Sequence, residues 1–546
     1  MSLPLDQLEL LERLRLFDPA WYARANSDVP DDESESWQHF LTTGFAEGRQ
    51  PGPRFVPEQY LAANPDLVQA GVDPLAHFLG FGYREGRALT PEERELKERT
   101  GSRWPESPLP ENLPGWYGTR PGPAPQGVVR ILAGLSVQQG GTPQTNEDLM
   151  IAFEARHSPV AETFVLRCAG DLLELFLYRA GIYVSLERHW LGQEVEPFPH
   201  QLDEYDDVVG QWLRDYGISL VHVHHSAWQS LGLMDSAYKL SIPVVYSVHD
   251  YYTVCPSVKL LDENQVFCRG RCTPGGGECH QEAWRPEQIG ALKHAGVYRW
   301  QQQFAGPLAL CAGFVTTSAL VRDIMLDIFP ALADKPFRLI PHGRDFDAFD
   351  SLAEAPTPGE PLRVVLPGYV ARSKGAGVLL ELANNPELVD VQWHVLGTVE
   401  DPEIRDQLPA NVTVHGPYQV SHFAQRVADI KPHLGAVLSI WPETWCHTLT
   451  ELWATGVPVL AFDLGAVGER LQQTRAGWLA PEVSASAMAA LIQQARQPAE
   501  WQQAVDAVSR WQLAGPQTRA GMAEAYWQLY QDIGAFAVER SGPSIK

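Results

Sequence analysis

Residues 441–469 read WPETWCHTLTELWATGVPVLAFDLGAVGE and combine two spaced carboxylates with an apolar, strand-like run. Glu443 and Glu451 are eight positions apart, with Glu443 in the loop before a predicted helix and Glu451 about two turns inside it. Two carboxylates near a strand end can hold sugar and ribose hydroxyls through charge-assisted hydrogen bonds. Solvated helix carboxylates would show the same spacing, so the surrounding residues decide between the two interpretations.

Short apolar runs alternate with helix-like segments on both sides of this stretch. Towards the C-terminus they are LRVVLPG from residue 362, VQWHVLG from 391, VTVHG from 412, GAVLSI from 435 and VPVLAF from 457. An earlier series consists of VVRILAGLS from residue 128, TFVLRC from 163, IYVSLE from 182, SLVHVH from 219, IPVVYSVHD from 242, GFVTTS from 313 and PFRLIPHG from 336. This alternation predicts the α/β class with parallel, doubly wound sheets. We expect two Rossmann-like domains at residues 128–345 and 346–515, then a C-terminal helix and tail at 516–546.

Two Gly-rich turns follow predicted strands, where ligands bind in such sheets. The first contains Gly140 and Gly141, whose backbone could approach a ligand beside a helix N-terminus that favours an anion. A plain strand–helix turn is the alternative. The second, PGYVARSKG, places Arg372 and Lys374 where they could neutralise a pyrophosphate leaving group. A solvated basic turn is the alternative there.

Histidines gather at two further strand ends, as HVHH at residues 222–225 and as His249-Asp250. Alternate strand residues share a face, so the first group is compatible with a metal site. Contact with a sugar or phosphate and ordinary packing are the other interpretations.

Taken together, these segments resemble the retaining GT-B glycosyltransferases of glycosyltransferase family 4. The family's usual donor-site run is P-x-x-x-E-x-x-G-x-x-x-x-E-A-x-A-x-G-x-P-V-V-A. The residues that match it are Glu443, Glu451, Ala454, Gly456, Pro458, Val459 and Ala461. Ile340 to Gly343 with Asp345 and Phe349 resembles the family's I-P-N-G-x-D-x-x-x-F segment, Val245 to Asp250 its strand ending in His-Asp, and Leu366 to Gly375 its basic turn.

The resemblance implies a GT-B fold, whose two Rossmann-like domains face a cleft, and sugar transfer from a nucleotide-sugar to a glycan or glycoconjugate with retention. It implies that Lys374 contacts the donor diphosphate with help from Arg372, and that Glu451 holds the ribose. Glu443 would contact the sugar, Gly140 and Gly141 would approach donor or acceptor, and His249 with Asp250 would line the reacting centre. The family needs no catalytic metal, and its members suggest a role in bacterial surface polysaccharide or glycoconjugate synthesis.

Two positions depart from the family pattern. Tyr369 stands where many members have Arg, and Cys446-His447 replaces the Gly inside the E-x7-E run. These departures keep open a non-catalytic GT-B scaffold or glycan-binding protein. Another GT-B chemistry, such as an epimerase or a phosphorylase, is a further alternative.

A Cys-rich insert interrupts the first α/β series. Cys255, Cys268, Cys272 and Cys279 lie in a Gly-rich stretch of 25 residues, within an insert at residues 255–280. Four cysteines could bind a structural zinc ion tetrahedrally, although this spacing is not a standard ribbon and His280 could replace one ligand. Disulfides and free thiols are the alternatives.

An internal repeat occupies the N-terminus. Phe17, Tyr22, Asn26, His39, Gly44 and Arg49 recur at a constant offset of 38 as Phe55, Tyr60, Asn64, His77, Gly82 and Arg87. We predict a helical repeat module over residues 1–90, with units at 17–54 and 55–92, similar to repeats attached to bacterial glycosyltransferases. Such a module is a candidate surface for a protein partner. Residues 91–127, which become Pro-rich, are predicted to form a linker.

Composition limits the remaining possibilities. The 546 residues have a net charge of −25, which argues against nucleic acid as a partner. The start lacks a signal-peptide pattern and no run reaches the length of a membrane-spanning helix. With seven cysteines, an odd number, we expect a reducing, cytoplasmic location, and peripheral attachment to the inner face of the membrane is compatible with this.

Overall fold

The computed structural model describes residues 3–14, 16–30, 32–83, 85–99, 124–135, 141–179, 181–281, 283–290 and 292–535. Gly140, most of the predicted linker and the end of the predicted tail lie outside these residues. The chain divides into two compact units, residues 1–246 with 530–546, and residues 247–529. This division differs from the predicted boundary near residue 345.

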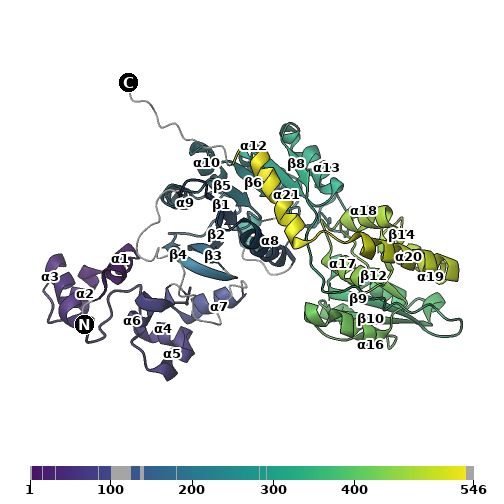
Figure 1. Cartoon of the computed structure of the whole chain (residues 1–546), viewed down its shortest axis with the longest axis horizontal. Helices are drawn as coiled ribbons and strands as arrows, with labels where there is room; N and C mark the ends of the chain where they lie inside the picture. The colour runs from purple at the N-terminus through teal and green to yellow at the C-terminus, as the bar shows by residue number, and fades with distance from the viewer. Residues whose placement is uncertain are drawn as a thin grey trace. The chain divides into compact units, whose positions relative to one another are not determined.

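The first unit begins with short helices, drawn in purple in Figure 1, and continues into an α/β part. The helical region comprises α1 (Leu5–Arg13), α2 (Pro19–Ala25), α3 (Glu33–His39), η1 (Phe40–Gly44), α4 (Pro57–Ala63), α5 (Pro65–Ala70), α6 (Pro74–His77), η2 (Phe78–Gly82) and α7 (Pro91–Arg99). The α/β part comprises β1 (Val129–Gly134), α8 (Gly141–His157), β2 (Ala161–Ala169), β3 (Leu172–Arg179), β4 (Ile182–Trp190), α9 (Asp203–Asp215), β5 (Leu220–Val223), α10 (Gly232–Lys239) and β6 (Val244–Ser247).

The two N-terminal repeats, at residues 17–54 and 55–92, place equivalent residues in equivalent contacts. The Tyr22 hydroxyl lies 3.2 Å from Nδ1 of His39, and the Tyr60 hydroxyl lies 2.9 Å from Nδ1 of His77. A Cβ atom added at Gly82 would lie 2.0 Å from the Tyr60 hydroxyl oxygen. The repeated Gly therefore makes room for the repeated Tyr. Each of the two histidines packs within its own repeat.

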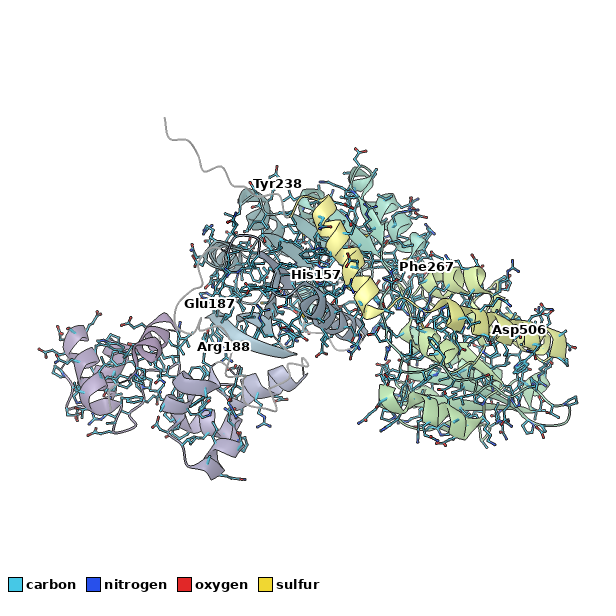
Figure 2. All side chains as sticks on the ribbon, viewed as in Figure 1. His157, Glu187, Arg188, Tyr238, Phe267 and Asp506 are labelled. Atoms are coloured by element: carbon cyan, nitrogen blue, oxygen red, sulfur yellow. The ribbon has the colours of Figure 1, made fainter. Side chains whose placement is uncertain are left out.

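A buried arginine of β4, which Figure 2 labels beside Glu187, contacts the helical region. The side chain of Arg188 is fully buried, and its guanidinium lies 3.3 Å from Glu174 and 3.5 Å from Glu93. Its Nη2 donates to the carbonyl of Arg87 at 3.0 Å. Helix α7 supplies Glu93, so the first nine residues of the predicted linker are helical.

Within the described residues, the first sheet has eight strands and the second has six. Six strands of the first sheet belong to the first unit in the order β4-β3-β2-β1-β5-β6. Strand β1 pairs in parallel with β2 and β5, as predicted, but β2, β3 and β4 form an antiparallel meander. The sheet is therefore mixed at this edge, where LLELFLYR forms a strand that was not predicted and seven of its eight residues are buried.

The second unit contains the remaining elements. They are α11 (Pro286–Ile289), α12 (Ala295–Leu310), β7 (Gly313–Thr316), α13 (Ala319–Ile328), η3 (Pro330–Leu332), β8 (Phe337–Leu339), β9 (Leu362–Val370), η4 (Arg372–Lys374), α14 (Ala376–Ala383), η5 (Pro386–Leu388), β10 (Val391–Val399), α15 (Pro402–Arg405), β11 (Val412–Val414), η6 (Val420–His422), α16 (Phe423–Ile430), β12 (Leu434–Val437), α17 (His447–Ala454), β13 (Val459–Phe462), α18 (Gly465–Thr474), β14 (Gly477–Ala480), α19 (Ala485–Ala495) and α20 (Pro498–Ala514). Helix α21 (Arg519–Asp532) runs across the boundary between the units.

The six-stranded sheet is parallel throughout, with the order β11-β10-β9-β12-β13-β14. Its strands send alternate residues into two separate hydrophobic clusters. On β9, Val364 packs in one cluster and Val365 in the other, and both are fully buried. Helices cover both faces of the sheet, as the predicted doubly wound arrangement requires. The carboxyl ends of β9 and β12 lead into the segments that contain the predicted site residues.

No helix among the described residues is long and apolar enough to cross a membrane.

Candidate functional site

Strand β9 ends in a tight basic turn. Arg372 to Lys374 form the short helix η4, and Gly375 follows with a φ of +84°. A Cβ atom at Gly375 would lie 2.1 Å from the carbonyl oxygen of Leu438, so this position requires Gly both for its backbone angle and for its close approach to the end of β12. The turn therefore holds Lys374 against the loop that follows β12.

Glu443 lies in that loop and is buried at 6% exposure. The ammonium of Lys374 lies 2.6 Å from Oε1 of Glu443, and the Ser439 hydroxyl donates to the same oxygen. The backbone of Glu443 is held as well, because its carbonyl accepts from the amide of Ala466, the second residue of α18, at 2.8 Å. Lys374 and Glu443, predicted from separate motifs, therefore form one site.

Glu451 lies within α17, the helix that follows this loop, and is 4% exposed. The guanidinium of Arg344 lies 2.9 Å from its Oε1, and the Tyr418 hydroxyl donates to its Oε2 at 2.9 Å. Burial raises the pKa of Glu451, while the Arg344 charge and the Tyr418 hydrogen bond lower it. Arg344 thus compensates a carboxylate that burial alone would tend to neutralise.

Cys446 connects the Glu443 loop to α17 in a backbone conformation that favours Gly. Its φ is +113° and its ψ is +93°. A non-glycine residue in such a region costs about 1–3 kcal/mol and persists only where its surroundings hold it. The thiol lies 3.2 Å from the Thr448 hydroxyl, and burial raises its pKa to about 11. The chain therefore keeps a Gly-like turn at this position while placing a side chain there.

His249, a predicted residue of the reacting centre, belongs to a group of three neighbouring histidines. Its ring lies 5.4 Å from that of His342, which lies 5.4 Å from that of His447. Its carbonyl accepts from the Thr444 hydroxyl, which places His249 next to the Glu443 loop. Burial lowers the pKa of His447 to about 3 and that of His342 well below its usual value. Both rings are therefore neutral at physiological pH.

Two other predicted residues, Arg372 and Asp250, have partners outside the Lys374–Glu443 pair. The side chain of Arg372 is 59% exposed and pairs with Asp401 and, at 3.5 Å, with Glu403. Asp250 accepts from the amide of Tyr252 at 2.9 Å. Gly141 is the exposed first residue of α8, in the first unit, and Gly140 lies outside the described residues. The predicted set therefore divides, with Lys374 and Glu443 in direct contact.

The metal predictions concern two other segments. Among the described residues, no group of three or more His, Cys, Asp or Glu side chains is arranged to hold a metal ion. His222 and His225 instead make hydrogen bonds, with the Tyr530 hydroxyl at 2.6 Å and the Ala227 amide at 3.0 Å. Cys255, Cys268, Cys272 and Cys279 are free thiols in this arrangement. Zinc binding by the insert stays a prediction.

Three side chains of the site were missed in the sequence. Arg344 follows the I-P-H-G segment directly, so its place next to that motif was the one available signal. Tyr418 and Arg470 belong to no motif, and their contacts with Glu451 and with the Cys446 carbonyl arise from tertiary packing. Four separate segments of the second unit are therefore in contact. Three contain Arg344, Tyr418 and Arg470, and the fourth runs from Cys446 to Glu451.

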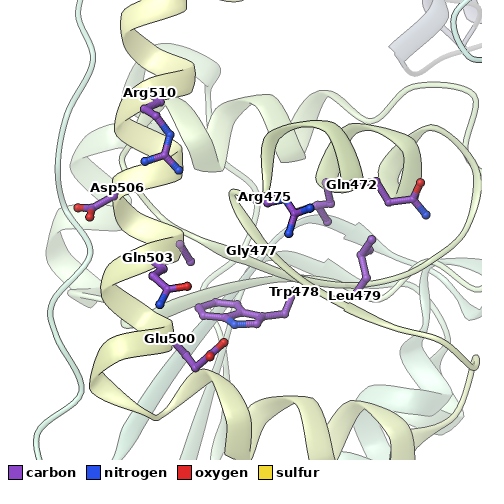
Figure 3. A pocket seen from close by; sticks show the side chains of 11 residues that line it. Gln472, Arg475, Gly477, Trp478, Leu479, Glu500, Gln503, Asp506 and Arg510 are labelled. Atoms are coloured by element: carbon purple, nitrogen blue, oxygen red, sulfur yellow. The ribbon is translucent and has the colours of Figure 1, made fainter.

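A shallow pocket of about 520 Å³ lies elsewhere in the second unit, between the end of α18, β14 and α20. Figure 3 shows Trp478 at its base with Arg475 and Arg510 above, and Glu500 and Asp506 also line it. Two positive and two negative side chains leave the lining without net charge. No predicted site residue lines this pocket, so it is separate from the candidate site.

Comparisons with known proteins agree with the architecture. Residues 191–348 match the family model described as Glycosyltransferase Family 4. No curated protein sequence matches the chain.

Two solved structures share the fold. The sucrose-phosphate synthase of Thermosynechococcus elongatus is 18% identical with a TM-score of 0.50, and the alignment covers 74% of this chain and 99% of that one. A glycosyltransferase from Rickettsia africae ESF-5 is 14% identical with a TM-score of 0.50, over 74% of this chain and 98% of that one. The fold is GT-B with an additional N-terminal helical region, as predicted.

Proposed function

We propose that this protein is a retaining glycosyltransferase that moves a sugar from a nucleotide-diphosphate sugar to a glycan or glycoconjugate acceptor. The observation that carries the proposal is the contact between Lys374 and Glu443, with Glu451 one helix further on, in a GT-B fold. One cation and two buried carboxylates match the parts of such a donor, because a diphosphate needs positive charge and sugar and ribose hydroxyls need acceptors. The family match at residues 191–348 supports the same class.

In the proposed reaction, the bond between the anomeric carbon and the diphosphate oxygen breaks while the acceptor oxygen bonds to that carbon on the same face. The acceptor proton passes to the departing diphosphate oxygen. Lys374 stabilises the charge that develops on the diphosphate, and Arg372 assists after leaving Asp401. Glu443 orients the sugar, Glu451 holds the ribose, and the ring of His249 lies beside the reacting carbon. No metal enters the reaction.

The test is a panel of nucleotide-sugars and glycan acceptors, followed by mass spectrometry of the products. We expect one nucleotide-sugar to yield a glycoside, and we expect Lys374→Met to abolish its formation. Arg510→Met is the matched control, since Arg510 is an exposed arginine of the same unit that belongs to the separate pocket. Nucleotide binding without product across the panel would favour the non-catalytic scaffold. Phosphate-dependent cleavage of a glycan would favour a phosphorylase.

A further inference from the structure

Arg470 bridges the beginning of α17 from the neighbouring helix α18. Its Nη1 donates to the carbonyl of Cys446 at 2.9 Å, and its Nη2 donates to the Thr450 hydroxyl at 2.7 Å. The guanidinium carbon lies 4.1 Å from the centre of the Trp445 ring and 5.2 Å from that of Trp453. One side chain thus contacts two residues before the helix and two within it.

The environment of Arg470 is unusual for a positive charge. Among the residues that the structure describes, no carboxylate lies within ion-pair distance of its guanidinium. Burial lowers its pKa to about 10, and the nearby Cys446 and Glu443 oppose that shift, so the group stays charged at neutral pH. Its directed contacts go instead to a backbone carbonyl, a hydroxyl and two indole faces. A planar fork of donors suits this combination, which a lysine ammonium does not reproduce.

The backbone carbonyl that Arg470 holds belongs to Cys446, the residue with a φ of +113°. Without that hydrogen bond, Cys446 would tend to return to a negative φ, since L-residues rarely adopt positive values. Glu443 lies three residues before this turn and Glu451 five residues after it, so a change in the turn would alter the separation of the two carboxylates.

We propose that Arg470 is a positioning residue that holds the Cys446 turn in its Gly-like conformation and thereby sets Glu443 relative to Glu451. The inference rests on the proposed function, because the two carboxylates are the donor contacts of that proposal. Arg470 and Cys446 are then energetically coupled, because the hydrogen bond from Arg470 offsets the backbone strain at Cys446.

The test is a double-mutant cycle between Arg470→Met and Cys446→Gly. Gly adopts positive φ values far more readily than Cys, so the turn should keep its shape in Cys446→Gly even when Arg470 is replaced. We expect Arg470→Met alone to lower kcat/KM about 100-fold, mostly through kcat, as a misplaced reacting group does. In the Cys446→Gly background the same substitution should cost about threefold or less. Arg470→Lys should resemble Arg470→Met, because the charge is kept and the fork is lost.

The same cycle in thermal unfolding needs no substrate. We expect Arg470→Met to lower Tm by several degrees more in the native background than in Cys446→Gly. Equal losses in both backgrounds, in activity and in Tm, would overturn the inference, as would full activity in Arg470→Lys. A native protein that transfers no sugar but still shows the coupled Tm losses contradicts the proposed function and leaves the Arg470–Cys446 coupling supported. Arg510→Met is again the control, with unchanged Tm and kcat/KM expected.

Discussion

The ammonium of Lys374 lies 2.6 Å from Oε1 of Glu443, so the cation expected to bind a diphosphate is already paired with a carboxylate of the same site. A lysine ammonium has three donors, so it can keep Glu443 and accept an additional anion. Glu443 nevertheless competes with a diphosphate for the same charge. In this account Lys374 favours nucleotide binding, whereas Glu443 opposes it.

The first prediction concerns separate substitutions of Lys374 and Glu443. Lys374→Met should weaken binding of the nucleoside diphosphate about 10-fold or more, since charge-assisted hydrogen bonds contribute about 1.5–3 kcal/mol. Glu443→Gln should leave that affinity unchanged or strengthen it, because the lysine loses its competing partner, yet it should lower sugar transfer. Isothermal titration with the nucleoside diphosphate measures both affinities. Equal weakening in the two variants would contradict the competition.

The second prediction concerns Gly82, the recurring glycine position of the second N-terminal repeat. A Cβ atom at Gly82 would lie 2.0 Å from the Tyr60 hydroxyl oxygen but 3.2 Å from the adjacent ring carbon. Gly82→Ala should therefore destabilise the helical region by about 1–3 kcal/mol through overpacking. Tyr60→Phe should recover part of that loss in the double variant, because it removes the clashing oxygen. Hydrogen exchange of residues 55–83 measures the effect, and additive losses would contradict this account.

The third prediction concerns the contact between the helical region and β4. Arg188→Met should remove the buried positive charge that lies next to Glu93 and Glu174 and cost about 3 kcal/mol, as breaking a buried ion pair does. Exchange of the amides in residues 182–190 should then accelerate about 100-fold, where local opening governs it. Arg49→Met is the control, since Arg49 pairs with the exposed Asp28 on the surface of the first unit. Identical exchange in both variants would show that Arg188 does not join the two parts.

The α/β halves, and the positions of the basic turn and of the Glu443 loop after their strands, were predictable because each depends on local patterns, namely apolar strands, Gly turns and a fixed carboxylate spacing. The antiparallel meander was not, since LLELFLYR lacks the alternation that separates a half-buried strand from a helix. The partners of Arg372 were also missed. Asp401 and Glu403 follow the neighbouring strand β10, and the motif containing Arg372 gives no sign of them.

The contacts of Arg344 and Arg470 depend on long-range packing. Arg344 reaches Glu451 across more than 100 positions of sequence, and Arg470 reaches the Cys446 carbonyl from the next helix. The Cys446 substitution was visible in the sequence, but its positive φ and the arginine that holds it required the structure. Sequence patterns thus located the carboxylates and one cation, while the residues that position them came from tertiary contacts.

The fourth prediction concerns pH and His200, which is 1% exposed. Burial, with a smaller contribution from His225, lowers its pKa to about 3 from a usual value of 6.5. Between those values the unfolded chain binds a proton that the folded chain does not, so stability falls as pH falls below 6.5. From pH 7 to pH 5 the native protein should lose about 2 kcal/mol more than His200→Gln in urea unfolding. Parallel losses in the two proteins would exclude His200 as a source.

The proton NMR spectrum of a transfer reaction, recorded as the product forms, tests the central proposal most directly. Our account predicts a glycoside whose anomeric proton has the configuration of the donor, formed together with the free nucleoside diphosphate, and no such product from Lys374→Met. A product of inverted configuration, or the same product formed at the native rate by Lys374→Met, would contradict the account.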